Sequence, residues 1–136
     1  MSRIKSRNTT PEIAVRQIVH RLGYRFRLKP QKLPGSPDIV LTKLRTAIFV
    51  HGCFWHHHKN CRLAYLPKSN RAFWKKKFAA NLDRDRRAMR NLRQSGWRTL
   101  VIWECQVSAP ARLSRRTADF LHKHASPPSY ANLTIK

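Results

Sequence analysis

The sequence predicts a mixed α/β fold with the element order α-β-β-β-α-β-α. Short apolar runs rich in β-branched residues alternate with longer amphipathic segments, which indicates strands interleaved with helices. The longest segment, residues 70–96, separates two of the runs, so a strand-helix-strand crossover should make at least one pair of strands parallel in a mixed sheet. At 136 residues the chain is long enough for one domain with a core and too short for two, so we expect one domain over residues 1–136.

The first expected element is a helix that follows a polar, basic arm over residues 1–9. The hydroxyl of Thr9 or Thr10 can cap the helix, Pro11 suits its first turn, and Glu12 suits the positive end of the helix dipole. Gly23 is a stop signal for the helix. The expected apolar stripe consists of Ile13, Ala14, Ile18 and Leu22.

Three strands are expected next. Residues 24–28 alternate polar and apolar side chains with period two. After a Pro/Gly turn, residues 38–41 form a second strand, and residues 46–50 form a third after a short Lys/Arg turn. The last two strands should pair as a hairpin, which would bring Asp38 and His51 to the same end of the sheet.

The second half of the chain contains a long helix, a strand and a final helix. Asn70 can cap the long helix, and Gly96 ends it. Residues 97–103 form an apolar strand, Pro110 opens the last helix, and residues 125–136 are a polar Ser/Pro-rich tail that we expect to be flexible. The apolar stripe of the long helix is Trp74, Phe78, Leu82, Met89 and Leu92. Its basic face, suited to phosphates, includes Arg71, Lys75, Lys76, Lys77, Arg84, Arg86, Arg87 and Arg90.

The charge balance points to a polyanionic partner. The chain has 29 Lys and Arg against six Asp and Glu, a net charge of +23. Nucleic acid is the leading partner, because the basic residues are spread through the chain instead of lying on one membrane-binding face; a ribosomal-type basic protein is the plain alternative. No apolar run approaches the ~18 residues of a membrane span, and no signal peptide is visible. We therefore expect a cytoplasmic protein with reduced cysteines.

Cysteine and histidine spacing predicts a structural zinc site. Cys53, one of the three histidines at 56–58, and Cys61 supply three ligands within nine residues, and Cys105 can complete a tetrahedron. Spacing alone leaves the choice of histidine open. The alternative is three ordinary buried thiols.

The strand ends predict a hydrolytic site. Asp38 begins one strand, and its carboxylate could hold Mg²⁺ together with the backbone carbonyl of Val50. His51 and His56 could then deprotonate water or protonate the leaving oxygen. The alternatives are a turn-capping role for Asp38 and a hydrogen-bonded core role for His51.

Pro37-Asp38 followed by two strands resembles the first half of the restriction-endonuclease-like PD-(D/E)XK pattern, although no Asp/Glu-x-Lys falls on residues 46–50. Several further motifs, in order, resemble the very short patch repair (Vsr) DNA mismatch endonucleases over about residues 9–105. The motifs that carry this resemblance are LPGSPD at 33–38, HGCFWH at 51–56, FW at 73–74, DRDRR at 83–87, GWR at 96–98 and WEC at 103–105.

The resemblance implies a restriction-endonuclease-like core and a Mg²⁺-dependent nick 5′ to the thymine of a T:G mismatch, the product of 5-methylcytosine deamination. It implies the catalytic residues Asp38, His51, His56 and Glu12, with Asp38 on the metal. It implies the zinc ligands Cys53, His58, Cys61 and Cys105, and the DNA-intercalating aromatics Phe54, Trp55 and Trp74. Two departures stand out: Val50 replaces the threonine of the best-known members, and the spacing from His58 to Cys61 has one extra residue.

The implied partner is double-stranded DNA with a T:G mismatch, bound by a monomer in the cytoplasm at the nucleoid. Other mismatch-repair proteins are further candidate partners, and no membrane is expected. Two rival hypotheses remain: a nuclease of the same fold with another target, and a non-catalytic zinc module that binds nucleic acid.

Overall fold

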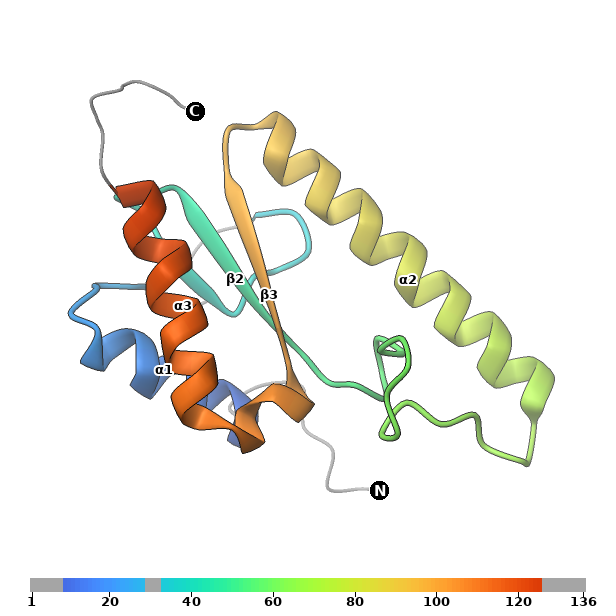
Figure 1. Cartoon of the computed structure of the whole chain (residues 1–136). Helices are drawn as coiled ribbons and strands as arrows, with labels where there is room; N and C mark the ends of the chain where they lie inside the picture. Colours follow the sequence, from blue (N-terminus) through green and yellow to red (C-terminus); the bar gives the residue numbers. More distant parts are fainter. Residues whose placement is uncertain (1–8, 29–32, 126–136) are drawn as a thin grey trace.

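The computed structural model describes residues 9–28 and 33–125. It confirms the mixed α/β class (Figure 1). The elements in order are α1 (Thr10–Arg21), β1 (Ile39–Leu41), β2 (Thr46–His51), α2 (Arg71–Gln94), β3 (Arg98–Trp103), the short 3₁₀ helix η1 (Glu104–Ser108) and α3 (Pro110–Ala125). Within the described residues no helix is long and apolar enough to cross a membrane.

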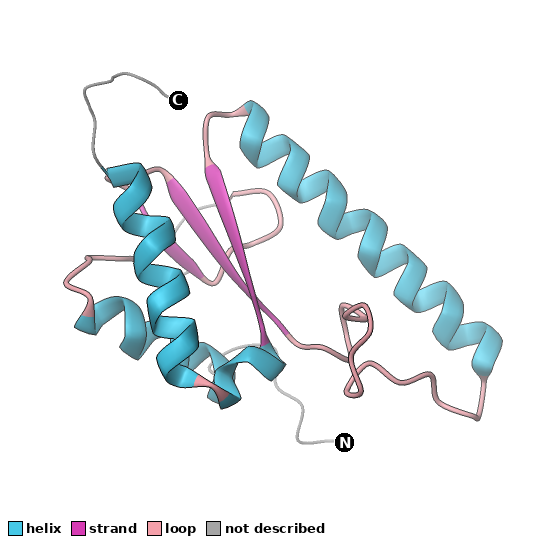
Figure 2. Cartoon of the chain, in the orientation of Figure 1, coloured by secondary structure: helices cyan, strands magenta, loops and turns pink. Residues whose placement is uncertain are grey.

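The sheet has the strand order β1-β2-β3 (Figure 2). β1 pairs with β2 antiparallel, as the hairpin predicts, and β2 pairs with β3 parallel through the α2 crossover. In the parallel register His51 lies opposite Trp103. The carboxyl ends of β2 and β3 therefore lie side by side. The segments that follow the two strands begin at the same end of the sheet.

Helices cover both faces of this sheet, so successive strand side chains, which point to opposite faces, are buried on either side. All six residues of β2 are buried. Helices α1 and α3 pack on one face over a core of Val15, Ile18, Val19, Ile39, Leu41, Ile48, Val50, Leu100, Ile102, Leu113 and Leu121. The other face, covered by α2, carries the smaller core of Val40, Ala47, Phe49, Leu92 and Trp97.

The strand expected at residues 24–28 does not form. Only Arg27 pairs, through an isolated bridge to Val40 in which each N–H donates to the other carbonyl at 2.8 Å. Tyr24 and Phe26 still turn inward and pack half-buried against the larger core. The period-two pattern thus reports which side chains face the core, whereas a strand also needs a neighbour of sufficient length, and β1 has three residues.

Helix α1 begins where predicted, and the Thr9 hydroxyl accepts the Glu12 N–H at 3.3 Å. The predicted stripe is wrong at its start, because Ile13 is 42% exposed while Val15, Ile18 and Val19 are buried. Ile13 lies about 200° around the helix from Val15, so one apolar face cannot include both.

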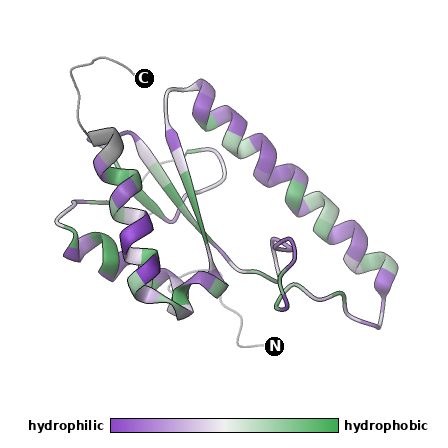
Figure 3. Ribbon diagram, in the orientation of Figure 1, coloured by the Kyte–Doolittle hydropathy of each residue, from purple (hydrophilic) through white to green (hydrophobic). Residues whose placement is uncertain are grey.

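Helix α2 also lies where predicted, but the side chain of Asn70 does not cap it. Asn70 adopts a left-handed conformation (φ 56°) and makes no side-chain cap hydrogen bond, which corrects its expected capping role. Gly96, at φ 88°, follows the helix as predicted. The buried residues of α2 are Phe78, Asn81, Ala88 and Leu92, and the rest of the helix is largely hydrophilic (Figure 3).

Candidate metal centre and nuclease site

The loop after β2 (residues 52–61, called the metal loop below) folds into tight turns that gather its cysteines and histidines. The His58 N–H donates to the Cys53 carbonyl at 2.9 Å, and the His56 N–H donates to the Gly52 carbonyl at 3.1 Å. His57 and Asn60 sit at positive φ (48° and 56°), which marks the two sharp turns. Because of these turns, side chains that are adjacent in the loop sequence point toward different parts of the protein.

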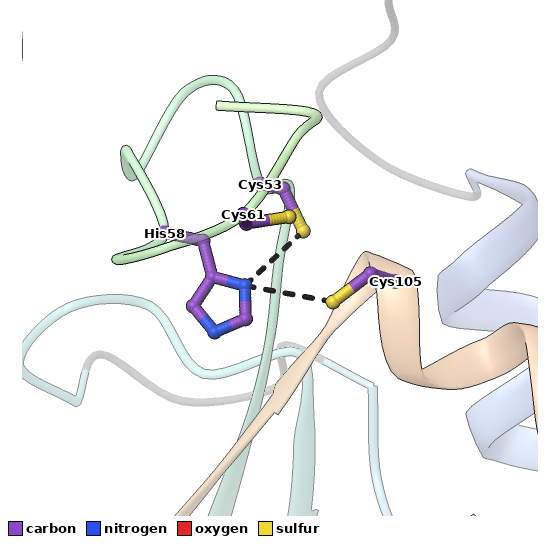
Figure 4. Close-up of side chains that lie close together, drawn as sticks. All are labelled: Cys53, His58, Cys61 and Cys105. Carbon is purple, nitrogen blue, oxygen red and sulfur yellow. Dashed lines mark hydrogen bonds between the residues drawn. The ribbon is translucent and has the colours of Figure 1, made fainter. Parts of the chain in front are cut away.

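Four side chains from this loop and η1 converge on one point (Figure 4). The potential ligand atoms of Cys53, His58, Cys61 and Cys105 all lie within 4.8 Å of one another. His58 Nδ1 lies 3.6 Å from the Cys53 sulfur and 3.5 Å from the Cys105 sulfur. Among the three histidines that spacing leaves open, the structure brings His58 to the thiols.

This donor set fits a tetrahedral zinc ion. With ordinary Zn–S and Zn–N bonds, neighbouring sulfur and nitrogen ligands are separated by about 3.6 Å, close to both His58 distances. Burial raises the pKa of the Cys53 thiol to about 12 and also raises the pKa of Cys105. Thiolates at these positions therefore need a cation to offset their desolvation, and a zinc ion would supply it.

Two residues at the end of β3 hold the metal loop against the sheet. The Glu104 carboxylate accepts the Cys53 N–H at 3.1 Å. Trp103 stacks on the His58 ring, with centroids 4.0 Å apart and planes 7° apart. The parallel β2–β3 pairing thus fixes where the loop sits.

A second cluster consists of His51, His56 and Asp85, whose potential ligand atoms also lie within 4.8 Å of one another. The imidazole rings of His51 and His56 are stacked, 3.8 Å between centroids and 3° between planes. His56 Nδ1 lies 2.7 Å from an Asp85 carboxylate oxygen. Desolvation by burial, with a smaller contribution from His56, lowers the pKa of His51 to about 4, so His51 is neutral near pH 7.

Asp38 lies outside this group of three and contacts the backbone of Val50, the residue before His51. Its carboxylate accepts the Val50 N–H at 2.7 Å, and its own N–H donates to the Ile48 carbonyl at 3.0 Å. Alternate residues of a strand bond the same neighbour, so the Val50 carbonyl faces the β1 side, where Asp38 lies. The Asp38 carboxylate and the Val50 carbonyl are both oxygen donors of the kind that Mg²⁺ prefers, so their chemistry is suited to that ion.

The remaining predicted site residues lie in two places, Glu12 on α1 and the aromatic residues where the metal loop meets α2. Glu12 is buried near the start of α1, with a carboxylate oxygen 3.5 Å from an Arg16 nitrogen. Phe54, Trp55 and Trp74 come together where the metal loop meets α2; the centroid of Phe54 lies 5.1 Å from that of Trp55 and 5.4 Å from that of Trp74.

Sequence reasoning assigned no role to Asp85, Trp103, Glu104 or Asn81. A signal for Asp85 was present, because Phe78, Asn81, Asp85, Ala88 and Leu92 follow one another at helical three- and four-residue spacing. An acid on the packed face of a helix needs a partner, and the metal loop provides His56. Asn81, one turn earlier, donates to the Trp55 carbonyl at 2.9 Å and ties the same loop to α2.

Fold and site together define a class: an α/β protein with a Cys/His cluster that could hold a metal ion and a histidine-carboxylate cluster at the end of a mixed sheet. The profile described as DNA mismatch endonuclease Vsr matches residues 1–63. A type II nicking enzyme from Xanthomonas oryzae pv. oryzae is 47% identical over 121 residues, 89% of this chain and 88% of the relative. The DNA mismatch endonuclease Vsr of Escherichia coli is 40% identical over 114 residues, 84% of this chain and 72% of the relative. The chain belongs to the Vsr family and is a DNA endonuclease.

Proposed function

We propose that this endonuclease nicks one strand of duplex DNA 5′ to the thymine of a T:G mismatch, in a reaction that depends on Mg²⁺. Family membership supports the reaction class. The observation that supports the assignment to specific residues is the stacked His51–His56 pair, which Asp85 anchors, together with the bond from the Val50 N–H to the Asp38 carboxylate one residue before His51.

The two histidines have different environments, which suits them to different tasks. His56 bonds Asp85 through Nδ1, so the carboxylate fixes the ring and leaves Nε2 to transfer a proton. His51 is neutral near pH 7 and can accept a proton or a hydrogen bond from water. Asp38 and the Val50 carbonyl would hold Mg²⁺, which supplies positive charge for the scissile phosphate and its attacking water.

The thiol-rich cluster has a structural role in this proposal. All four donors come from protein, so a zinc ion would have no open position for substrate. Its ligands Cys53 and His58 flank Phe54, Trp55 and the catalytic His56, so the ion would fix all three. Phe54, Trp55 and Trp74 then form the wedge beside the mismatch, whose weak pairing lowers the cost of unstacking.

Glu12 would assist from α1, and the basic face of α2 would bind phosphates without reading sequence. We place the protein in the cytoplasm, at the nucleoid, acting as a monomer. Other mismatch-repair proteins are candidate partners in the same process.

A nicking assay tests the function. Two duplexes that differ only by one T:G pair are incubated with the protein, with and without Mg²⁺, and strand breaks are mapped at single-nucleotide resolution. The expected result is one break, 5′ to the mismatched thymine, in one duplex and only with Mg²⁺. Equal cutting of the matched duplex would favour a nuclease with another target. The absence of any break would favour a non-catalytic module.

A further inference from the structure

Six aromatic rings gather where the metal loop meets α2. They are Phe54, Trp55, Tyr65, Phe73, Trp74 and Phe78. Phe54 is the centre of this aromatic cluster, because four of the other rings lie with their centroids 5.1 to 5.4 Å from its own. Its ring is therefore packed from several sides.

Exposure rises sharply from the inside of the aromatic cluster to its rim. Phe78 is 3% exposed, and Phe54 and Trp74 are half-buried, whereas Tyr65 is 57% and Phe73 is 58% exposed. Tyr65 lies against Phe54 at 5.1 Å, and Phe73 lies against Trp74 at 5.2 Å. Each rim residue thus contacts the cluster through its ring and is more than half exposed to solvent.

Every charged side chain in the segment that carries the two rim rings is positive. From residue 62 to residue 82 the chain has no acidic residue. The exposed cations of this stretch are Arg62, Lys68, Arg71, Lys75, Lys76 and Lys77. Protein interfaces are depleted of charge at their centres, whereas sites for unpaired nucleic acid combine aromatic rings with basic side chains. The rim therefore matches a nucleobase better than a protein partner.

We propose that Tyr65 and Phe73 each offer a stacking surface for unpaired nucleobases of bound DNA, in addition to the wedge of Phe54, Trp55 and Trp74, and that together they form a stacking platform. The half-buried Phe54 contacts Tyr65 and the half-buried Trp74 contacts Phe73, so each ring of the platform has its own support. The platform has a fixed place relative to the active site, since Asn81 ties the Trp55 carbonyl to α2 one helical turn before Asp85. The proposal rests on the proposed function only in taking DNA as the ligand.

The test uses a duplex that carries one extrahelical 2-aminopurine, no T:G pair and no Mg²⁺. Affinity is measured by anisotropy, and stacking of the extra base is measured by quenching of 2-aminopurine emission. We expect Tyr65→Ala and Phe73→Ala each to bind about tenfold more weakly, as loss of one base–aromatic contact predicts, and to quench less. Tyr65→Phe and Phe73→Tyr should match the wild type in both measurements.

Two controls separate stacking from other effects. Leu63→Ala removes an exposed apolar side chain (38% exposed) from the same segment without removing a ring, and it should bind within about twofold of the wild type. Phe73→Leu keeps apolar area and loses the ring, so it should be as weak as Phe73→Ala. Wild-type affinity in both alanine variants or in Phe73→Leu would overturn the platform. So would weakening of all variants, including Phe73→Tyr, in step with a lower melting temperature. The probe contains no mismatch and the buffer contains no Mg²⁺. The binding and quenching results therefore do not depend on the outcome of the nicking assay.

Discussion

At the scale of single residues, the His56–Asp85 contact decides how a proton could move. A carboxylate 2.7 Å from Nδ1 holds the imidazole in one orientation and favours the tautomer with the proton on Nδ1. We expect Asp85→Asn to keep the fold and to lower kcat by about 10²-fold, the low end of the range for general acid–base catalysis, with a smaller change in KM. Single-turnover nicking of a T:G duplex measures the effect.

Asp83 offers the matched control, two residues away on the same helix. Its carboxylate is 63% exposed and pairs with Arg87 at 2.9 Å, away from the metal loop. Asp83→Asn should nick within about twofold of the wild type, since a surface ion pair contributes little. An equal loss in both variants would show that general charge near the DNA matters, not the contact with His56.

A second prediction concerns Asp38, the acid proposed to hold Mg²⁺. Asp38→Ala should abolish nicking while DNA binding persists, because the basic surface proposed to contact phosphates is unchanged. Gel-shift and nicking assays on one duplex separate the two properties. Asp38 also accepts the Val50 N–H, so a melting curve is needed to show that the variant still folds. Nicking at the wild-type rate would refute the metal assignment.

Residue types in order along the chain were enough to predict that the three cysteines gather with a histidine, while the choice of His58 came from the family resemblance. The antiparallel pairing of β1 and β2 also confirms that Asp38 and His51 lie at the same end of the sheet. The contact between His56 and Asp85 could not be predicted from the sequence. The two residues are 29 positions apart, and their contact depends on how α2 crosses the sheet. The same holds for Trp103 on His58, which requires the parallel register of β2 and β3.

At the scale of elements, the turn before β1 packs closely against α2. Gly35 has φ 78°, and a Cβ there would lie 2.6 Å from the Ala88 Cβ and 3.1 Å from the Phe49 ring. Gly23 also has positive φ (90°), with nothing within 4 Å of an added Cβ. Gly35→Ala should therefore destabilise the protein by about 1–3 kcal/mol more than Gly23→Ala, because both strain the backbone and only one overpacks. Urea unfolding measures the difference, and equal stabilities would contradict this packing.

Element positions were well predicted where a local signal marks them, as at Thr9, Gly96 and Pro110. They were poorly predicted where pairing or packing decides, as for residues 24–28, and the 3₁₀ helix η1 was not foreseen. In η1 the Gln106 side chain accepts a hydrogen bond from the Trp103 N–H at 2.9 Å, so a side chain satisfies the last backbone N–H of β3. Such a local bond leaves no periodic pattern in the sequence.

At the scale of the whole molecule, one metal ion would join the loop after β2 to the end of β3. We expect chelation of zinc, or Cys105→Ser, to lower the melting temperature and to reduce nicking even with Mg²⁺ in excess, because His56 lies between the ligands Cys53 and His58. Metal analysis should find one zinc per chain in the wild type and less in Cys105→Ser. Ser108→Ala is the matched control, because it removes the hydrogen bond from the exposed Ser108 hydroxyl to the Cys105 carbonyl (2.9 Å) and keeps the Cys105 thiol, so it should retain its zinc. Unchanged zinc content in Cys105→Ser would exclude Cys105 as a ligand.

The net charge of +23 should make stability and DNA binding respond to salt in opposite directions. With six acids in the chain, most of the 29 Lys and Arg have no opposite charge to pair with, so the folded chain repels itself. Raising ionic strength from about 0.02 to 0.2 M shortens the Debye length to roughly 7 Å and should raise the melting temperature. Over the same range, affinity for a matched duplex should fall steeply, because each phosphate contact contributes about −0.9 to the slope of log K against log salt. Thermal melts and binding isotherms in the same buffers test both trends, and a melting temperature that falls with salt would mean that attractive ion pairs outweigh the repulsion.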